Sequence, residues 1–321
     1  MRGTTLRQLR AFSQVAQHHS FARAAAELHL TPSAVSLQIK ELEQVIGVSL
    51  FGRGGKAVSL TRAGDLLLAD VRRALLALED AEETLTRLRG RETGSVCIGM
   101  VSNAKYFVPR LLAQFHNEHP GIELRLSVGN REQLVRQMSS GDVNLVIMGA
   151  PPVGLDATAE PFAPQPLGVI AAPEHELAHA RAIPVTALAG CEFIVREPGS
   201  GTRAAMERYF RDASIAPVRL MEVAGNETIK QAVIANMGIA FVSLHTAGME
   251  LQGRMLVALD VIGLPVMRRW YVVCPGGEPL APAAEALRRF IIDHGGDLIA
   301  RQFADLWRTE PAQWPHDALA A

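Results

Sequence analysis

The sequence has few cysteines and no long hydrophobic run. Only three of its 321 residues are cysteines, Cys97, Cys191 and Cys274. They are scattered among apolar neighbours and form neither a disulfide framework nor a metal-ligand cluster, so we expect reduced thiols in the core. No apolar run reaches the roughly 18 residues that a membrane span needs. Because the N-terminus also lacks the apolar core of a signal peptide, we expect a cytoplasmic protein.

Signatures of common catalytic sites are also missing. The sequence has no G-x-S-x-G nucleophile elbow, and Cys191 lies in an apolar stretch without an obvious activating base. His116 and His119 could hold a metal, but no carboxylate–histidine grouping supports the pair, and surface positions are the favoured interpretation. We therefore predict no catalytic residues and no metal site.

The charge of the chain is unevenly distributed. The formal net charge is −1, yet residues 1–64 hold eight Lys or Arg and three acidic residues, a net of +5. The other 257 residues then carry −6. A small basic domain joined to a larger acidic one indicates that the N-terminal part meets a polyanion.

The basic segment has the pattern of a winged helix-turn-helix. Apolar residues recur at helical spacing over 4–18; Ser20 can cap a second helix over 21–28, and Thr31 a third helix over 32–47. Two β-like pieces around Gly54-Gly55 then predict a wing. Hydroxyls and amides near a recognition helix can read bases, and cations can contact phosphates. The predicted DNA-binding residues are Arg23, Thr31, Pro32, Ser33, Ser36, Gln38, Lys40, Arg53 and Lys56. The alternative is a small helical bundle whose basic residues are merely solvated.

A heptad pattern follows from Thr61 onwards. Apolar residues alternate at spacings of four and three over three repeats, which is typical of a helix that packs along a narrow seam. The pattern favours a dimerising linker, because helix-turn-helix proteins usually bind paired half-sites as dimers. One side of an intrachain bundle is the alternative. The predicted seam consists of Leu67, Val71, Ala74, Leu78, Ala81, Leu85 and Leu88.

From Ser95 the sequence alternates strand-like and helix-like pieces. The first unit runs through "SVCIGMV", "IELRLSVG" and "VNLVIMGA", and the second follows a Pro-rich passage over 151–166. The strand "RWYVVCP" and a helix over 282–293 then return to the first unit. This order predicts two α/β lobes with a ligand cleft between them.

One loop of the second lobe has a nucleotide-binding spacing. Gly199, Gly201 and Ala204 fit G-x-G-x-x-A, and Glu222 stands where a ribose-binding carboxylate would belong, which suggests an NAD(P)-dependent oxidoreductase. However, Pro198 and the two residues before it separate the strand from the glycines. A ligand-free turn is a second interpretation. We favour a third, an anion cradle in which backbone N–H groups, hydroxyls and an arginine bind a phosphate or carboxylate.

At this point the chain resembles a family along nearly its whole length. The segment "LRQLRAFSQVAQHHSFARAAAELHLTPSAVSLQIKELEQVIGVSLFGR", followed by "LTRAG", a helical linker and two α/β lobes, is similar to LysR-type transcriptional regulators. Gly52, Leu37 and Asn144 depart from residues usual in the family. The resemblance implies an α/β chain with a winged helix-turn-helix over 1–61, a linker helix over 62–94, a periplasmic-binding-protein-like effector domain over 95–301 and a tail over 302–321. Its lobe I would take about 95–163 and 267–301, and its lobe II about 164–266.

Shorter motifs are similar to those of the CbbR group within that family, which regulates carbon-dioxide-fixation (Calvin-cycle, Rubisco) operons. They include "SNAKYFVPRLL", "FIVREPGSGTR" and "NETIKQAV". The resemblance implies promoter DNA as partner, a homodimer or homotetramer, RNA polymerase as a further contact, and no cofactor. The implied effector is a small anionic metabolite: a sugar phosphate, phosphoenolpyruvate or NADPH.

The family's effector positions fall on loops facing the cleft. Two of them have a simpler explanation, because helix capping alone would account for Asn130 and Asn226. Lys105 and Lys230, nearby, are expected to be solvated. A solute-binding protein with the same two lobes is the remaining alternative, although it leaves the basic domain unexplained. The implied effector-binding residues are Ser102, Asn103, Asn130, Arg131, Arg196, Pro198, Ser200, Thr202, Arg203, Asn226, Glu227 and Thr228.

Overall fold

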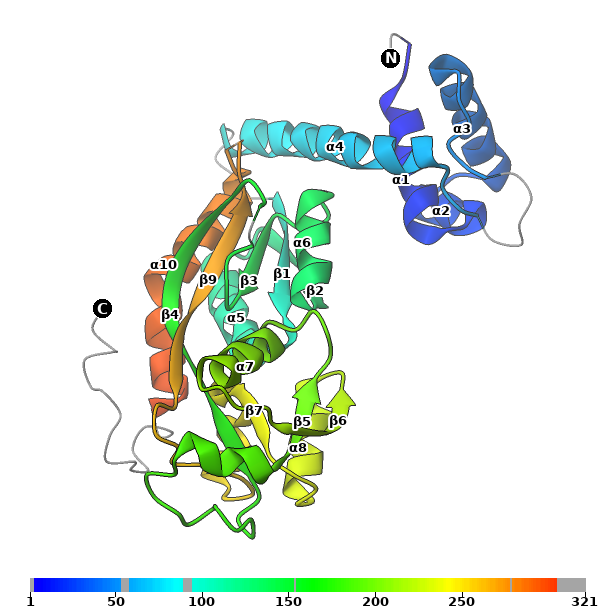
Figure 1. Cartoon of the computed structure of the whole chain (residues 1–321). Helices are drawn as coiled ribbons and strands as arrows, with labels where there is room; N and C mark the ends of the chain where they lie inside the picture. Colours follow the sequence, from blue (N-terminus) through cyan, green and yellow to red (C-terminus); the bar gives the residue numbers. More distant parts are fainter. Residues whose placement is uncertain (1–2, 53–57, 89–93, 153, 278, 305–321) are drawn as a thin grey trace. The chain divides into compact units, whose positions relative to one another are not determined.

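The chain divides into two compact units, which are described separately (Figure 1). In this computed structural model, residues 3–52, 58–88, 94–152, 154–277 and 279–304 are described. One unit comprises Met1–Arg91 with Gln137–Asp142, and the other Glu92–Arg136 with Val143–Ala321. None of the described helices is long and apolar enough to cross a bilayer.

The first unit begins with three short helices whose starts follow from their capping residues. Thr5 forms a capping box with Gln8. Ser20 and Thr31 accept hydrogen bonds from backbone N–H groups of the helices that they precede, as predicted. The helices are α1 (Leu6–His18), α2 (Phe21–Glu27) and α3 (Pro32–Ile46).

A compact core holds these helices together. Phe12, Val35 and Leu42 are fully buried, and the Phe12 and Phe51 rings meet edge to face with centroids 5.6 Å apart. Phe51 pairs with Leu60 in an antiparallel bridge, which forms the base of the predicted wing. Arg53 and Lys56, predicted at the wing tip, lie outside the described residues. The helix-turn-helix prediction is confirmed.

The predicted linker is a single helix, α4 (Arg62–Leu88). Its first turns belong to the N-terminal core, because Val71 is only 2% exposed and Leu67 packs against the same cluster. These two residues therefore pack inside the core of their own domain. Farther along, Leu78 is 40% exposed. Ala74 and Ala81 are exposed as well, while the side chains of Leu85 and Leu88 lie outside the described part.

The second unit is built on a mixed sheet whose strand order is β2-β1-β3-β9-β4-β7, with β8 paired to β4. The β1 strand pairs with β2 and β3 in parallel, as the alternating pattern predicted, whereas β9 runs antiparallel to β3 and β4. The strands are β1 (Gly94–Val101), β2 (Ile122–Gly129), β3 (Leu145–Met148), β4 (Ala157–Ala171), β7 (Ala240–Ser243), β8 (Val257–Ala258) and β9 (Val266–Pro275).

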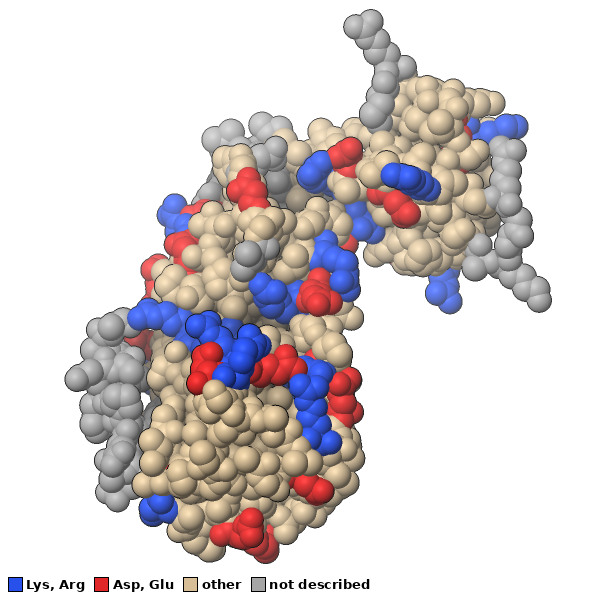
Figure 2. All heavy atoms as spheres, viewed as in Figure 1, with Lys and Arg blue, Asp and Glu red and all other residues tan. Residues whose placement is uncertain are grey.

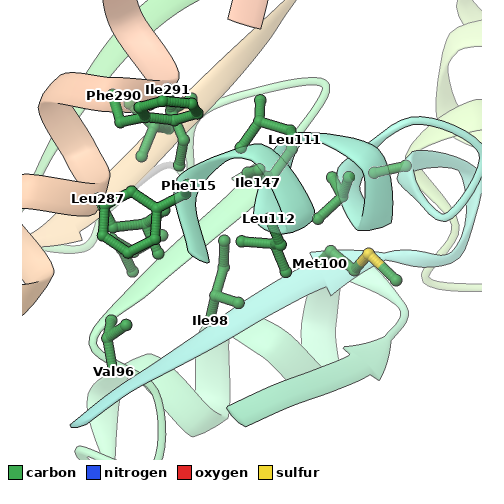
Figure 3. Close-up of a cluster of buried hydrophobic side chains, with 14 of the residues drawn as sticks. Val96, Ile98, Met100, Leu111, Leu112, Phe115, Ile147, Leu287, Phe290 and Ile291 are labelled. Carbon is green, nitrogen blue, oxygen red and sulfur yellow. The ribbon is translucent and has the colours of Figure 1, made fainter. Parts of the chain in front are cut away.

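Helices pack against one apolar face of this sheet and form the core of lobe I with it (Figure 3). Alternate β1 residues, including Ile98, point at the helix α5 (Val108–Glu118) and at α10 (Pro282–Gln302). Phe115 and Phe290 from the two helices meet edge to face at 5.4 Å. The helix α10 is longer than the helix over 282–293 that the sequence pattern predicted. The helix α6 (Arg131–Ser139) completes this lobe.

The long strands β4 and β9 connect the two lobes (Figure 1). Much of the Pro-rich passage over 151–166, for which no strand was predicted, is therefore strand. The prolines are tolerated because residues 157–166 pair only with β9, which leaves their other edge without a ladder partner among the described strands.

Lobe II has its own small parallel sheet, β5 (Glu192–Arg196) with β6 (Val218–Val223). The helices α7 (Gly201–Asp212) and α8 (Asn226–Ile234), with the short α9 (Gly248–Gln252), surround it and β7. Phe193 and Phe210 centre one of its two apolar clusters, and Ile229 and Val242 belong to the other. The predicted two-lobed α/β fold is confirmed.

Candidate DNA-binding surface and effector cleft

The N-terminal domain presents the start of α3 to solvent. Thr31 accepts a hydrogen bond from the backbone N–H of Ala34 at 3.2 Å, and its hydroxyl lies 3.0 Å from that of Ser33. Since Val35 and Ile39 face the core, the remaining positions face outwards. Leu37, 54% exposed, adds an apolar group of the kind that contacts thymine methyls. Predicted DNA contacts that are exposed or half-exposed are Arg23, Thr31, Pro32, Ser33, Ser36, Gln38 and Lys40.

A small inner cavity lies where the ends of β1 and β3 meet the start of α7. Its volume is about 30 Å³, which is room for only a few water molecules. Seven predicted effector residues are brought together around it: Ser102, Asn103, Asn130, Arg131, Arg196, Ser200 and Thr202. The lining mixes hydroxyls, amides and guanidinium groups, so the chemistry of the cavity suits an anion.

Polar contacts cross this cavity from lobe to lobe. Asn103 donates from its side-chain nitrogen to the Thr202 hydroxyl at 3.4 Å, and both residues are buried. Asn130 also has the structural role considered for it, because it exchanges hydrogen bonds of 2.9 Å with Gln133 at the start of α6. It therefore caps a helix and lines the cavity at the same time.

Arg196, predicted as an effector cation, is engaged within the protein. Its guanidinium makes two 2.7 Å hydrogen bonds to the carboxylate of Glu197 and one of 2.7 Å to the Asn226 side-chain oxygen. Another, at 3.2 Å, reaches the Ser102 hydroxyl in lobe I. Burial alone would raise the pKa of Glu197, but the hydrogen bonds and charge of Arg196 lower it. Arg196 thus ties the lobes together with its charge already neutralised.

A wider groove adjoins the inner cavity along α7. Its volume is about 980 Å³, and Pro198 and Arg203 of the predicted set line it. Arg203 is paired with Glu207 at 3.0 Å and with Glu222 at 2.5 Å, and these hydrogen bonds raise its pKa. The Glu222 carboxylate, the proposed ribose ligand of a dinucleotide site, is therefore held by an arginine.

The remaining predicted effector residues lie elsewhere. Asn226 is buried behind Arg196, and Thr228 is exposed; neither lines the cavity or the groove, nor does Glu227. These three effector positions implied by the family lie in the first turn of α8. Asn226 and Glu227 contact other protein residues there. Asn226 accepts a hydrogen bond from Arg196, and this contact is its link to the residues that line the cavity.

Glu227 instead belongs to an ionic cluster around the buried Lys230 that joins the lobes, which we call the Lys230 cluster (Lys230, Glu227, Glu250 and Tyr106). Lys230 Nζ lies 2.7 Å from Glu250, 3.2 Å from Glu227 and 4.8 Å from the centre of the Tyr106 ring. Tyr106 donates its hydroxyl to Glu227 at 2.5 Å, and its pKa is raised by burial and by that bond. The expectation that Lys230 is solvated is wrong, since it is 3% exposed.

Two cavity residues were missed by sequence reasoning, Gln165 on β4 and Arg268 on β9. Gln165 is 2% exposed, and its side-chain oxygen has no hydrogen-bond partner among the described residues. Arg268 donates to the backbone oxygens of Gly149 and Gly201. Gln165 stands inside the Pro-rich passage, where no strand was expected. The polar pair Arg268-Arg269 within an apolar strand was the one available signal.

Comparisons with known proteins identify both parts of the chain. The model of bacterial regulatory helix-turn-helix proteins of the lysR family matches residues 6–65, and that of the LysR substrate binding domain matches residues 89–296. The chain belongs to the LysR family. This LysR regulator is a DNA-binding transcription regulator with a small-molecule effector domain, not an enzyme.

Its relatives include other transcriptional regulators. It is 45% identical to the transcriptional regulator CfxR of Cupriavidus necator over 95% of this chain and 96% of that protein. It is 47% identical to the RuBisCO operon transcriptional regulator of Allochromatium vinosum over 92% of this chain and 98% of that protein.

Solved structures agree on the fold of this LysR regulator. The CcmR regulatory domain of Synechocystis in complex with 2-PG is 38% identical with a TM-score of 0.61, covering 63% of this chain and 97% of that one. Full-length CbnR with its target DNA is 20% identical with a TM-score of 0.65, covering 91% and 100%. The NAD(P)-dependent oxidoreductase alternative finds no support in these comparisons.

Proposed function

We propose that this regulator controls carbon-dioxide-fixation genes in the cytoplasm in response to a small anionic metabolite. The observation that carries the proposal is the 45–47% identity, over 89–95% of the chain, to three regulators that include the RuBisCO operon regulator of Allochromatium vinosum and CbbR of Rhodospirillum rubrum. A match of this length includes both the DNA-reading and the effector-binding parts.

In this proposal the exposed start of α3 enters the major groove. Ser33, Ser36 and Gln38 read base edges, while Arg23 and Lys40 contact phosphates. Arg53 and Lys56 of the wing add backbone contacts. The division of labour is supported by the exposure of the α3 side chains and by the short hydroxyl and amide groups near its N-terminus.

We also propose dimerisation along α4, with assembly to a tetramer and contact to RNA polymerase. The seam is then Ala74, Leu78 and Ala81, continuing to Leu85 and Leu88, because Leu67 and Val71 are taken up by the N-terminal core. Paired helices would set the spacing of two DNA-binding domains on an operator.

The effector in this proposal is an anion bound between the lobes, with its charge at the inner cavity. Ser102, Asn103, Ser200 and Thr202 supply hydroxyl and amide groups, and the α7 N-terminus adds its positive end. Support comes from the CcmR domain, which is solved with 2-PG. A sugar phosphate, phosphoenolpyruvate and NADPH are the other candidates.

The test is a titration of the purified protein against the promoter DNA that flanks its own gene. It is run at several salt concentrations, with and without ribulose 1,5-bisphosphate, phosphoenolpyruvate, NADPH and 2-PG. We expect tight, salt-sensitive binding whose affinity or footprint changes with one metabolite. Specific DNA binding that no metabolite alters would contradict the effector proposal, and the absence of specific binding would contradict the operon proposal.

A further inference from the structure

Two arginines beside the cleft carry charges that no described carboxylate neutralises. Arg196 and Arg203 are ion-paired, as described above. Arg131 instead donates to the backbone oxygen of Pro151 at 3.0 Å, and Arg268 donates to the backbone oxygens of Gly149 and Gly201. Within the described part of the chain, neither Arg131 nor Arg268 forms an ion pair.

Both guanidinium groups are partly withdrawn from water. A counter-charge would stabilise such a group, because backbone oxygens satisfy its hydrogen bonds but do not cancel its charge. Burial lowers the pKa of Arg268, and the charges of Arg131 and Arg208 lower it further. An anion placed between these groups would remove the repulsion and the unpaired charge together.

The two arginines also mark the boundary between a space too small for a metabolite and one of the right size. Both line the inner cavity of about 30 Å³ and the groove of about 980 Å³. Ligand sites usually have volumes of about 300–1,000 Å³, a range that includes the groove but not the cavity. A ligand whose body lies in the groove would therefore present its charge at Arg131 and Arg268.

The groove is positively charged overall. It is lined by five arginines, which adds Arg203, Arg208 and Arg269 to the two above, and by the acids Glu132, Glu207 and Asp212, for a net of +2. Glu207 is paired with Arg203 and Arg219, and Asp212 lies 3.7 Å from Arg208. Figure 2 shows basic side chains, with acidic ones among them, over the region where Figure 1 places α7.

A second, independent feature is an unused polar atom in the adjoining cavity. The side-chain oxygen of Gln165 is buried without a partner in the described structure, and Gly149 leaves room for it. A Cβ on Gly149 would lie 2.2 Å from that oxygen. This oxygen can therefore accept a hydrogen bond from a hydroxyl of a ligand that extends into the cavity.

We propose that Arg131 and Arg268 form an anion site at the mouth of the cleft, which binds a multiply charged phosphate-bearing ligand lying in the groove along α7. Arg268 bonds to Gly149 in lobe I and to Gly201 in lobe II, so the site acts on the contact between the lobes. This inference deepens the proposed function and rests on it for its regulatory consequence, not for the binding itself.

The experiment is calorimetric titration of the full-length protein with inorganic pyrophosphate and, separately, with inorganic phosphate. Arg131→Gln and Arg268→Gln are compared with Arg211→Gln, which removes an equal charge from an exposed position of α7 that does not line the groove. We expect pyrophosphate to bind the wild type more tightly than phosphate. Each groove variant should weaken pyrophosphate binding about tenfold or more, and the control less than about twofold.

Equal pyrophosphate affinity in all four proteins would overturn the proposal, as would an absence of pyrophosphate binding to the wild type. Arg131 is half-exposed, so its variant decides the matter if Arg268→Gln does not fold. Each sample is also titrated with promoter DNA. Wild type that binds DNA but not pyrophosphate refutes the anion site alone, whereas pyrophosphate binding without specific DNA binding refutes the proposed function alone.

Discussion

The Lys230 cluster gives the most quantitative prediction, for the substitution Lys230→Met. Lys230 is 3% exposed, and its main partner is the Glu250 carboxylate at 2.7 Å, whose side chain is 12% exposed. Removing one partner of a buried ion pair costs about 3–5 kcal/mol, because the other charge remains buried without compensation. The Glu250 side chain keeps some contact with water, so we expect a loss near the lower end of the range.

A loss of about 3 kcal/mol lowers the melting temperature of a domain of this size by about 6–12 °C. The assay is thermal unfolding of the full-length protein followed by tryptophan fluorescence, to which Trp270, fully buried in lobe I, contributes. The Lys230→Met/Glu250→Gln double variant should recover much of the loss, since no lone buried charge remains.

The matched control is Lys105→Met. Lys105 also pairs with Glu227, at 3.4 Å, but its side chain is 37% exposed and that of Glu227 is 54% exposed. A pair this open to solvent contributes about 1 kcal/mol or less. If Lys230→Met and Lys105→Met lower the melting temperature equally, burial of Lys230 does not make its ion pair stabilise the lobes.

Three further outcomes follow from other parts of the structure. Phe12→Ala should cost about 3–5 kcal/mol by leaving a cavity in the N-terminal core, and mobility-shift assays should then show lost DNA binding while the effector domain melts unchanged. Lys40→Gln should weaken promoter binding uniformly across sequences and reduce the salt slope by about one, measured by titration at several salt concentrations. His245 should make stability pH-dependent, because burial lowers its pKa to about 3. Its contribution to stability is complete above the ordinary pKa of about 6.5 and is lost as pH falls towards about 3. The melting temperature, measured from pH 7.5 to 4, should therefore change less for His245→Gln than for the wild type.

The DNA-binding domain was predictable because its signals are local. Ser20 and Thr31 mark the starts of helices because their side chains accept hydrogen bonds from the backbone N–H three residues later. The core positions of α3 follow from helical periodicity. The heptad seam was harder. Val71 fits a dimer seam and an intrachain core equally well in sequence, and only the packing of α4 against α1 assigns it to the core.

The cleft was less predictable because its pairing is tertiary. Arg196 and Glu197 are neighbours in the sequence, but nothing there indicates that the arginine would also bind Asn226 and Ser102. Lys230 looked like a surface residue of a helix until Glu250, 20 residues later, supplied its partner. Arg268 reaches the cleft only because β9 returns beside β4, a long-range pairing without a local signature.

These contacts set the energy scale on which an effector can act. An anion that enters the inner cavity must part the lobes, because a volume of about 30 Å³ does not hold a phosphorylated metabolite. It then exchanges the contacts of Ser102 with Arg196 and of Asn103 with Thr202 for its own. Moving two arrangements from 1:99 to 99:1 takes about 5.5 kcal/mol of preference for one of them. Two or three hydrogen bonds to charged groups, at about 1.5–3 kcal/mol each, supply that amount. The effector therefore needs to gain only a few contacts in the parted arrangement, and tight binding to both arrangements would change nothing.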